Sequence, residues 1–269
     1  MQSASGKARR AGVELAYSVQ GNGTETVLLI QGLGARAADW GPALPRALAE
    51  RFRVVLFDNR GTGSSDKPRE AWTLDDMTLD ALAVLDAVGA ERAHVIGVSM
   101  GGMIAQLVAL DHAARVERLV LLSTNAGGRS AVHPGPEMLS VFQPPRGTPP
   151  EQIMRHALEL IGAPGWAASH PSEVEELVRL SLEQPTPKYA FSAQLQALLA
   201  SDRSERVRDI AQSTLVVHGD ADRLIPVQNG RLLAERIPGA RLEILDGIGH
   251  MAMWEAPGKL CRVVLDFLE

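Results

Sequence analysis

The sequence predicts an α/β fold, a mostly parallel central sheet flanked by helices, and two observations carry this prediction. Short, continuously apolar runs rich in β-branched residues recur along the chain, and segments with helical periodicity separate them. Continuous apolarity is typical of strands that are covered on both faces, as in a parallel sheet with crossover helices. The alternation of such strands with helices indicates the α/β class.

The expected elements follow one another along the chain. Strands are predicted at TVLLIQG from 26, FRVVLFD from 52, AHVIGVS from 93, RLVLLST from 118, TLVVHGD from 214 and ARLEILDG from 240. Amphipathic helices are predicted at 75–88, 100–110, 227–236 and 256–268, between or after these strands.

The stretch at 125–206 interrupts the alternation. It holds ten of the sixteen prolines and no pattern of a buried strand. Apolar residues between Ile153 and Ile161 recur at helical spacing, so we expect a helix there. The sequence therefore predicts a core formed by 1–124 and 207–269, and a helical cap, or lid, at 125–206.

Two helix starts are also expected within this cap. Thr186 followed by Pro187 is typical of an N-cap with proline at the first helical position. Ser172 and Glu175 have the spacing of a capping box.

Composition and charge argue against some classes of binding partner. The net charge is −5 and there is no dense run of Lys and Arg, which argues against nucleic acid or an anionic membrane. Cys261 is the only cysteine, so we expect no intrachain disulfide. The first residues, MQSASGKARR, are basic but no apolar run follows them, and no stretch reaches the ~18 apolar residues of a membrane span, so neither secretion nor membrane spanning is expected. We expect a cytoplasmic protein that acts on a small neutral or apolar molecule.

A candidate nucleophile stands where an apolar strand meets a helical pattern. The motif Gly97-Val98-Ser99-Met100-Gly101 has the form G-x-S-x-G, and its glycines lack side chains that would collide in a tight strand-to-helix turn. A serine hydroxyl is a weak nucleophile, so it needs a base and a group that orients the base. The motif alone is also compatible with a tight junction that carries an idle serine.

A base and two orienting groups follow later in the chain. VVHGDADRLIP places Asp220 and Asp222 after one expected strand, and DGIGHMAMWEAP places His250 after the next. The resulting order is serine, aspartate, histidine, which is the order found in one particular hydrolase fold.

These segments resemble the α/β-hydrolase-fold serine hydrolases, in particular carboxylesterases and enol-lactonases with a helical cap. The similarity extends over nearly the whole chain and is carried by QGLG, DNRGTGSSD, GVSMGG, HGDADRLIP and GIGHMAMWEAP, in the order of the family. It implies Ser99 as nucleophile and His250 as general base. The family pattern H-G-x-x-D-x-x-x-P selects Asp222 rather than Asp220 as the orienting aspartate, and it assigns His218 a structural role.

An oxyanion hole is expected from backbone groups. Met100 follows the nucleophile at the start of a helix, where its N–H points toward developing negative charge. The resemblance implies Leu33 of QGLG as the second donor. Gln31 departs from the family, which usually has histidine at this position, and this departure weakens any assignment to a subfamily.

The resemblance implies a hydrolase without cofactor or metal that cleaves carboxylic esters of small, mainly apolar substrates through an acyl-enzyme. The remaining histidines lack the spacing of metal ligands. Enol-lactone hydrolysis, carbon–carbon bond hydrolysis and perhydrolysis use the same triad and stay open as alternatives. A ligand receptor that retains the triad is the alternative from a different functional class.

Overall fold

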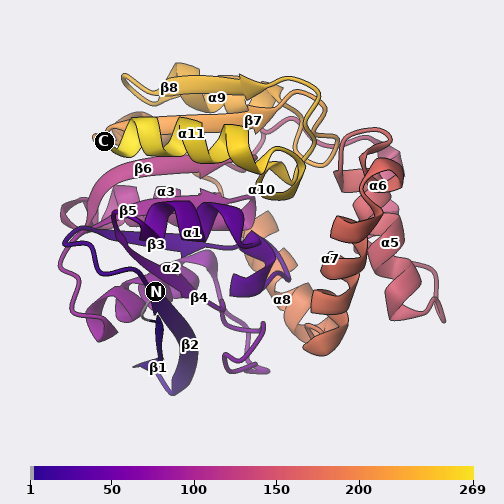
Figure 1. The fold of residues 1–269 in the computed structure, drawn as a ribbon, viewed down its shortest axis with the longest axis horizontal. Helices are drawn as coiled ribbons and strands as arrows, with labels where there is room; N and C mark the ends of the chain where they lie inside the picture. The colour runs from indigo at the N-terminus through magenta and orange to yellow at the C-terminus, as the bar shows by residue number, and fades with distance from the viewer. Residues whose placement is uncertain (1–2) are drawn as a thin grey trace.

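An eight-stranded sheet forms the centre of the molecule (Figure 1). The computed structural model describes residues 3–269. The strands are β1 (Ser3–Arg10), β2 (Val13–Gln20), β3 (Thr26–Ile30), β4 (Arg53–Phe57), β5 (Ala93–Val98), β6 (Val116–Leu122), β7 (Thr214–Gly219) and β8 (Arg241–Leu245). They lie side by side in the order β1-β2-β4-β3-β5-β6-β7-β8. β2 is antiparallel to both of its neighbours and every other pair is parallel, which confirms the predicted mostly parallel sheet.

Six of the eight strands were predicted, and the first two were missed. In β2, Val13, Leu15, Tyr17 and Val19 alternate with polar or small residues, because only one face of this part of the sheet is well covered. A search for continuously apolar runs does not detect a strand with this alternation. β1 has no such alternation, and its pairing with β2 is a tertiary feature.

The α-helices of the described chain lie partly on the two faces of the sheet and partly in the stretch between β6 and β7. They are α1 (Ala43–Ala49), α2 (Leu74–Ala87), α3 (Met100–Asp111), α4 (Leu139–Phe142), α5 (Pro150–Ile161), α6 (Trp166–Ser169), α7 (Pro171–Glu183), α8 (Lys188–Ala200), α9 (Gln228–Arg236), α10 (Ala252–Glu255) and α11 (Pro257–Leu268). In Figure 1, α1 and α11 lie in front of the sheet, whereas α2, α3 and α9 lie behind it. Four of these helices match the four predicted ranges to within one residue at every end, and α1 was missed.

The core is divided by the sheet into two apolar layers. In β3, Leu28 and Ile30 pack in the layer with α2 and α3, whereas Val27 and Leu29 pack in the layer with α1 and α11. All four side chains are fully buried. Burial on both faces is the physical reason for the continuous apolar runs in the sequence.

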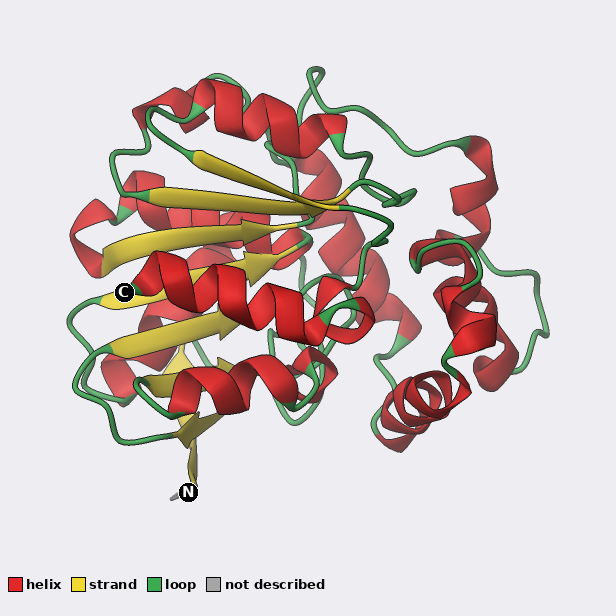
Figure 2. Ribbon diagram, turned by 45° about the horizontal axis from the view of Figure 1, so that its top comes forward, coloured by secondary structure: helices red, strands yellow, loops and turns green. Residues whose placement is uncertain are grey.

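The chain between β6 and β7 contains helices α4 to α8, in the stretch that we call the cap segment (residues 125–206). In Figure 2, part of this segment stands apart from the sheet, at the end toward which the parallel strands point. A single bridge between Gly127 and Asp202 joins its two ends. The division of the chain into a core and a cap stays a prediction.

Both predicted helix caps in this segment were wrong. Helix α8 begins at Lys188, with Pro187 at the N-cap position, and the Thr186 hydroxyl donates instead to the carbonyl of Gly34 at 2.8 Å. Helix α7 begins at Pro171, so Ser172 is already its second residue and makes no cap bond. In both cases the proline sets the helix start, because it needs no hydrogen bond to its nitrogen.

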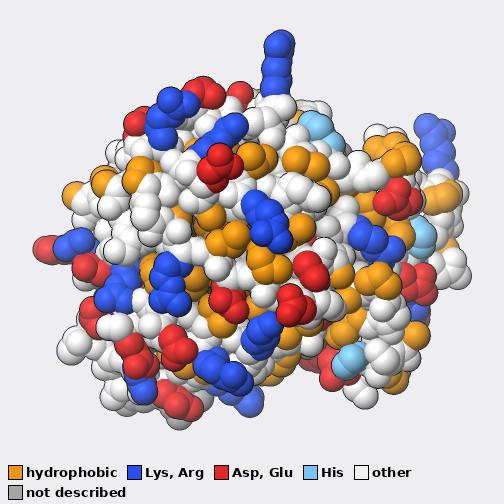
Figure 3. Space-filling model, turned by 90° about the horizontal axis from the view of Figure 1, so that it is seen from above, with side chains coloured by type: hydrophobic (Ala, Val, Ile, Leu, Met, Phe, Trp, Pro, Cys, Tyr) orange, Lys and Arg blue, Asp and Glu red, His pale blue; other side chains and the backbone are white. Residues whose placement is uncertain are grey.

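The surface mixes charges of both signs. On the face in Figure 3, Lys and Arg side chains are interspersed with Asp and Glu side chains. Among the helices of residues 3–269, none combines the length and the apolarity that a membrane crossing requires.

Candidate active site

Ser99 stands at the turn between β5 and α3, at the end of the sheet where the parallel strands finish. Its backbone has φ of 54° and ψ of −122°, a conformation that costs a residue with a side chain about 1–3 kcal/mol. The Ser99 N–H donates to the carbonyl of Leu122 at 2.9 Å, and the Ser99 carbonyl accepts from the Thr124 hydroxyl at 2.7 Å. Ser99 is half-buried between two buried neighbours, so the turn presents its side chain at the surface of the core.

The glycines around Ser99 are required by close backbone contacts. A Cβ atom at Gly97 would lie 2.2 Å from the carbonyl oxygen of Gly101. A Cβ atom at Gly101 would lie 2.1 Å from the carbonyl oxygen of Ile30. The G-x-S-x-G spacing is therefore a packing requirement of this turn.

Asp222 and His250 are in direct contact. His250 Nδ1 lies 2.8 Å from Asp222 Oδ2, and both residues are buried. A carboxylate at Nδ1 keeps the proton on that nitrogen, which leaves the lone pair of Nε2 free to accept a proton.

Asp222 is held as a carboxylate by its surroundings. Its Oδ1 accepts from the backbone N–H groups of Leu224 and Ile225 at 3.0 and 2.9 Å, and His218 Nε2 lies 3.4 Å from Oδ2. Burial raises the pKa of Asp222, but the charge of His250 and the hydrogen bonds from both histidines outweigh it and hold the pKa at about 2. His218 also contacts the Ile225 carbonyl at 2.7 Å, so it supports the loop that carries Asp222.

The two candidate aspartates have different surroundings. Asp220 is exposed, and its Oδ1 accepts from the backbone N–H of Gly247 at 2.6 Å. It fastens one loop to another and does not contact His250. The structure thus brings Asp222, and not Asp220, against the imidazole.

The loop around His250 is fastened by a residue that sequence reasoning missed. The Glu255 carboxylate accepts from the N–H groups on either side of the histidine, Gly249 at 2.8 Å and Met251 at 2.9 Å. It also accepts from the N–H of Ala163 in the cap segment at 2.9 Å, and the His250 N–H donates to the Ile161 carbonyl at 2.8 Å. No pattern in the sequence signals a contact between residues 92 positions apart.

The loop QGLG at 31–34 packs against Ser99. A Cβ atom at Gly32 would lie 3.1 Å from Ser99 Cβ and 3.6 Å from its Oγ. The Gly32 N–H donates to the Gln31 side-chain oxygen at 2.7 Å, so Gln31 braces the loop from within. Within residues 3–269 the backbone N–H groups of Leu33 and Met100 donate to no acceptor, and both predicted oxyanion donors are therefore available.

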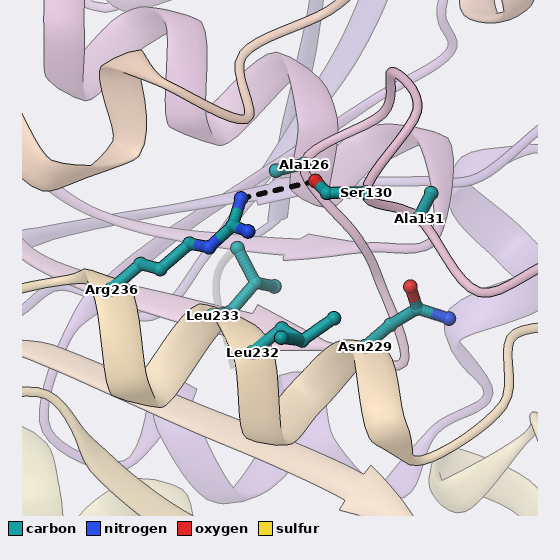
Figure 4. A pocket seen from close by; sticks show the side chains of 7 residues that line it. All are labelled: Ala126, Ser130, Ala131, Asn229, Leu232, Leu233 and Arg236. Atoms are coloured by element: carbon teal, nitrogen blue, oxygen red, sulfur yellow. Dashed lines mark hydrogen bonds between the residues drawn. The ribbon is translucent and has the colours of Figure 1, made fainter.

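Two cavities of the structure lie away from these residues. Figure 4 shows one of about 10 Å³, between α9 and the loop at 126–131, where Arg236 Nη1 donates to Ser130 Oγ at 3.0 Å. That volume holds at most one water molecule. The other, of about 400 Å³, is lined by the start of α2 and the end of α8, and neither cavity is bordered by Ser99, Asp222 or His250.

Across the described part of the chain, His, Cys, Asp and Glu side chains do not gather in any group of three that could hold a metal ion.

Comparison with known proteins gives concordant matches over most of the chain. Residues 25–257 match the family model described as the alpha/beta hydrolase fold. A RutD protein of Caulobacter sp. (strain K31), provisionally named a carbamate hydrolase, is 34% identical over 250 residues, which cover 91% of this chain and 90% of the relative. The 2-hydroxy-6-oxononadienedioate/2-hydroxy-6-oxononatrienedioate hydrolase 1 of Dechloromonas aromatica (strain RCB) is 30% identical over 267 residues, 95% of this chain and 91% of the relative.

A solved structure gives the same result in three dimensions. The enol-lactonase from Burkholderia xenovorans LB400 superposes with a TM-score of 0.85 at 26% identity, over 98% of this chain and 99% of that one.

Proposed function

Because the chain belongs to the α/β-hydrolase-fold family and is a hydrolase, we propose that it cleaves carboxylic esters of small, mainly apolar substrates through an acyl-enzyme on Ser99. The observation that carries the proposal is the buried Asp222–His250 pair at 2.8 Å, on the same edge of the sheet as a serine in a strained turn. Such an arrangement supplies a nucleophile, a base and a group that orients the base.

In the first half of the reaction, Ser99 Oγ attacks the ester carbonyl carbon while His250 Nε2 takes the hydroxyl proton. The carbonyl oxygen becomes an oxyanion and accepts from the backbone N–H groups of Leu33 and Met100. When the intermediate collapses, the bond to the alkoxy oxygen breaks, the imidazolium returns its proton to that oxygen, and the alcohol leaves. The acyl group remains on Ser99.

In the second half, a water molecule attacks the acyl carbon and gives its proton to His250 Nε2. Collapse of the second intermediate breaks the bond to Ser99 Oγ, which recovers a proton from the imidazolium. The products are the acid and the free enzyme. Asp222 stays ionised throughout, which is consistent with its pKa of about 2.

Two further substrate classes use the same steps. In a lactone the alcohol stays attached to the acyl chain, and the similarity to an enol-lactonase structure favours this variant. Hydrolysis of a carbon–carbon bond is favoured by the relative named as an oxononadienedioate hydrolase, and there the leaving group is a carbanion that must be protonated.

We also propose that the cap segment covers the site and selects the acyl group. Phe191 of α8 supports this, because a Cβ atom at Gly34 would lie 2.8 Å from its ring. A ring in this place borders the loop that carries Leu33. Phe191→Ala should therefore change the ratio of kcat/KM between acyl lengths, with each methylene worth about 1–3 kcal/mol.

The test is turnover of a panel of p-nitrophenyl esters, aliphatic esters, lactones and a vinylogous 1,5-diketone, with product analysis for each. Ester turnover that is abolished in Ser99→Ala supports the proposal. Turnover of the diketone alone would move the function to carbon–carbon hydrolysis, and a single slow burst without turnover would indicate a receptor. Peroxyacid formation with added hydrogen peroxide identifies perhydrolysis.

A further inference from the structure

Both polar groups of Gly34 are held by side chains of the cap segment. The Gly34 N–H donates to Gln194 Oε1 at 2.8 Å, and the Gly34 carbonyl accepts from the Thr186 hydroxyl at 2.8 Å. Gly34 follows Leu33, the predicted oxyanion donor, directly in the chain. We call the loop at 31–34 the oxyanion loop. The cap segment thus contacts this loop through two hydrogen bonds, both at Gly34.

Both the oxygen and the nitrogen of the Gln194 carboxamide form hydrogen bonds. It is fully buried in α8, and its Nε2 donates to the carbonyl of Arg60 at 2.8 Å. One side chain therefore joins α8 to the loop after β3 and to the loop after β4. A buried carboxamide with both ends bonded is fixed in orientation, because rotation would leave two buried groups unpaired.

The bonds to Gly34 determine the form of the turn that presents Leu33. The Ala35 N–H donates to the Gly32 carbonyl at 3.3 Å, and Gly34 has φ of +71°. This is the pattern of a type II turn, in which the third residue needs a positive φ. Gln194 holds the central peptide of this turn, between Leu33 and Gly34, in the orientation that the type II form requires.

The Leu33 N–H is left free by the same arrangement. The N–H before it is bonded to the Gln31 side chain, and the N–H after it is bonded to Gln194. Within the described chain it is the one N–H of residues 32–34 that has no acceptor. A donor with fixed neighbours and no partner of its own is preorganised for a charge that appears only during the reaction.

We propose that Gln194, assisted by Thr186, is a positioning residue that makes the oxyanion hole dependent on the docked cap. The inference rests on the proposed function of Leu33 as an oxyanion donor. When α8 is in place, the turn at 32–35 is held in its type II form and the Leu33 N–H faces the reacting carbonyl oxygen. When the contact is lost, the turn at 32–35 is no longer fixed at Gly34, and the Leu33 N–H, one peptide earlier, is held less firmly in place. The cap segment then affects the chemical step as well as the choice of substrate.

Three variants test the inference. Gln194→Met keeps the length of the side chain but removes both hydrogen bonds, and Thr186→Val removes only the hydroxyl. Tyr189→Phe is the matched control, because it removes a hydrogen bond from the same helix to the Lys67 carbonyl, away from the oxyanion loop. Gln194→Glu is the rescue variant, since burial favours the neutral carboxylic acid, which can both accept from Gly34 and donate to Arg60.

The main readout is the second-order rate at which a fluorophosphonate modifies Ser99, because its phosphoryl oxygen occupies the oxyanion hole. We expect this rate to fall about 10-fold or more in Gln194→Met and several-fold in Thr186→Val, below the 10²–10³-fold effect of removing a donor. For esters, kcat should fall by a similar factor while KM stays within about 3-fold of the wild-type value. Tyr189→Phe should stay within about 2-fold of the wild-type protein, and Gln194→Glu should recover part of the rate.

Thermal unfolding of each variant separates positioning from stability. A folded Gln194→Met with wild-type labelling rate and kcat would overturn the inference, even if its melting temperature were lower. If Gln194→Met does not fold, a wild-type rate in folded Thr186→Val would overturn it instead. A wild-type protein that is labelled at Ser99 but hydrolyses no ester would contradict the proposed substrate class alone. A wild-type protein that is not labelled at all would overturn both proposals.

Discussion

The turn that carries Ser99 and the loop that carries His250 are held by different parts of the molecule. Ser99 takes its backbone hydrogen bonds from Leu122 and Thr124, at the end of the neighbouring strand β6. The loop around His250 is bonded to Ile161 and, through Glu255, to Ala163, both in the cap segment. The proposed nucleophile thus depends on the sheet, whereas the proposed base depends on the cap segment as well.

The cap segment therefore holds two loops of the candidate site. Its first half contacts the histidine loop, and its second half contacts the oxyanion loop through Thr186 and Gln194. Arg36, which is buried beside the oxyanion loop, also donates to the Leu180 carbonyl of α7. We expect changes in the cap to alter reaction rates by moving these two loops, while the Ser99 turn keeps its geometry.

The largest loss of kcat should come from a substitution in the turn that carries Ser99. Ser99→Ala removes the nucleophile, and kcat should fall by about 10⁶ if the effect resembles that in other triads. A fluorophosphonate probe should label the wild-type protein once and the variant not at all. Labelling of the variant at another serine would show that the sheet does not hold the nucleophile.

The next largest effect should distinguish the two aspartates. Asp222→Asn favours the wrong tautomer of His250, so kcat should fall by about 10⁴. Asp220→Asn is the matched control and should leave kcat within about 2-fold, since Asp220 only bonds to Gly247. Circular dichroism establishes that both variants are folded. A greater loss in Asp220→Asn would reverse the assignment.

A smaller effect is expected where the cap holds the base. Glu255→Gln keeps the shape of the side chain but replaces one acceptor with a donor, so one of its three N–H partners near His250 loses its bond. We expect kcat to fall about 10-fold, because a misplaced base loses part of the 10²–10⁴-fold that general base catalysis contributes. Glu235→Gln removes the same charge from an exposed position of α9 and serves as control. Equal kcat values in the two variants would mean that Glu255 does not position His250.

The smallest effect concerns stability at low pH. The pKa of Asp222 is about 2 in the folded protein and about 3.9 in an unfolded chain, so ionised Asp222 stabilises the fold by about 2–3 kcal/mol above pH 4. This contribution is lost as the pH falls through 2. Urea unfolding should therefore give wild-type and Asp222→Asn free energies whose difference shrinks by about that amount between pH 5 and pH 2. A difference that is independent of pH would contradict the low pKa.

Patterns in the sequence predicted six of the eight strands and the tight turn at Ser99. β3, β5 and β7 are buried along their whole length, so their apolar runs are continuous and visible in one dimension. The need for glycine at positions 97 and 101 is also visible in the sequence. Each glycine avoids a clash with backbone that lies in the same short segment or in an adjacent strand. The alternation in β2 was also present in the sequence, but it required a search at period two.

Only the tertiary structure decided how the remaining site residues are held. The choice between Asp220 and Asp222 rested on a family pattern, and the contact with His250 spans 28 residues. Gln194 and Gly34 are 160 residues apart, and Glu255 and Ala163 are 92 apart. A glutamine or glutamate in an amphipathic helix or loop looks the same in sequence whether its side chain meets water or a buried N–H. Its role appears only when folding brings the unpaired groups of distant loops within hydrogen-bond distance, since a buried N–H without a partner costs about 1–3 kcal/mol.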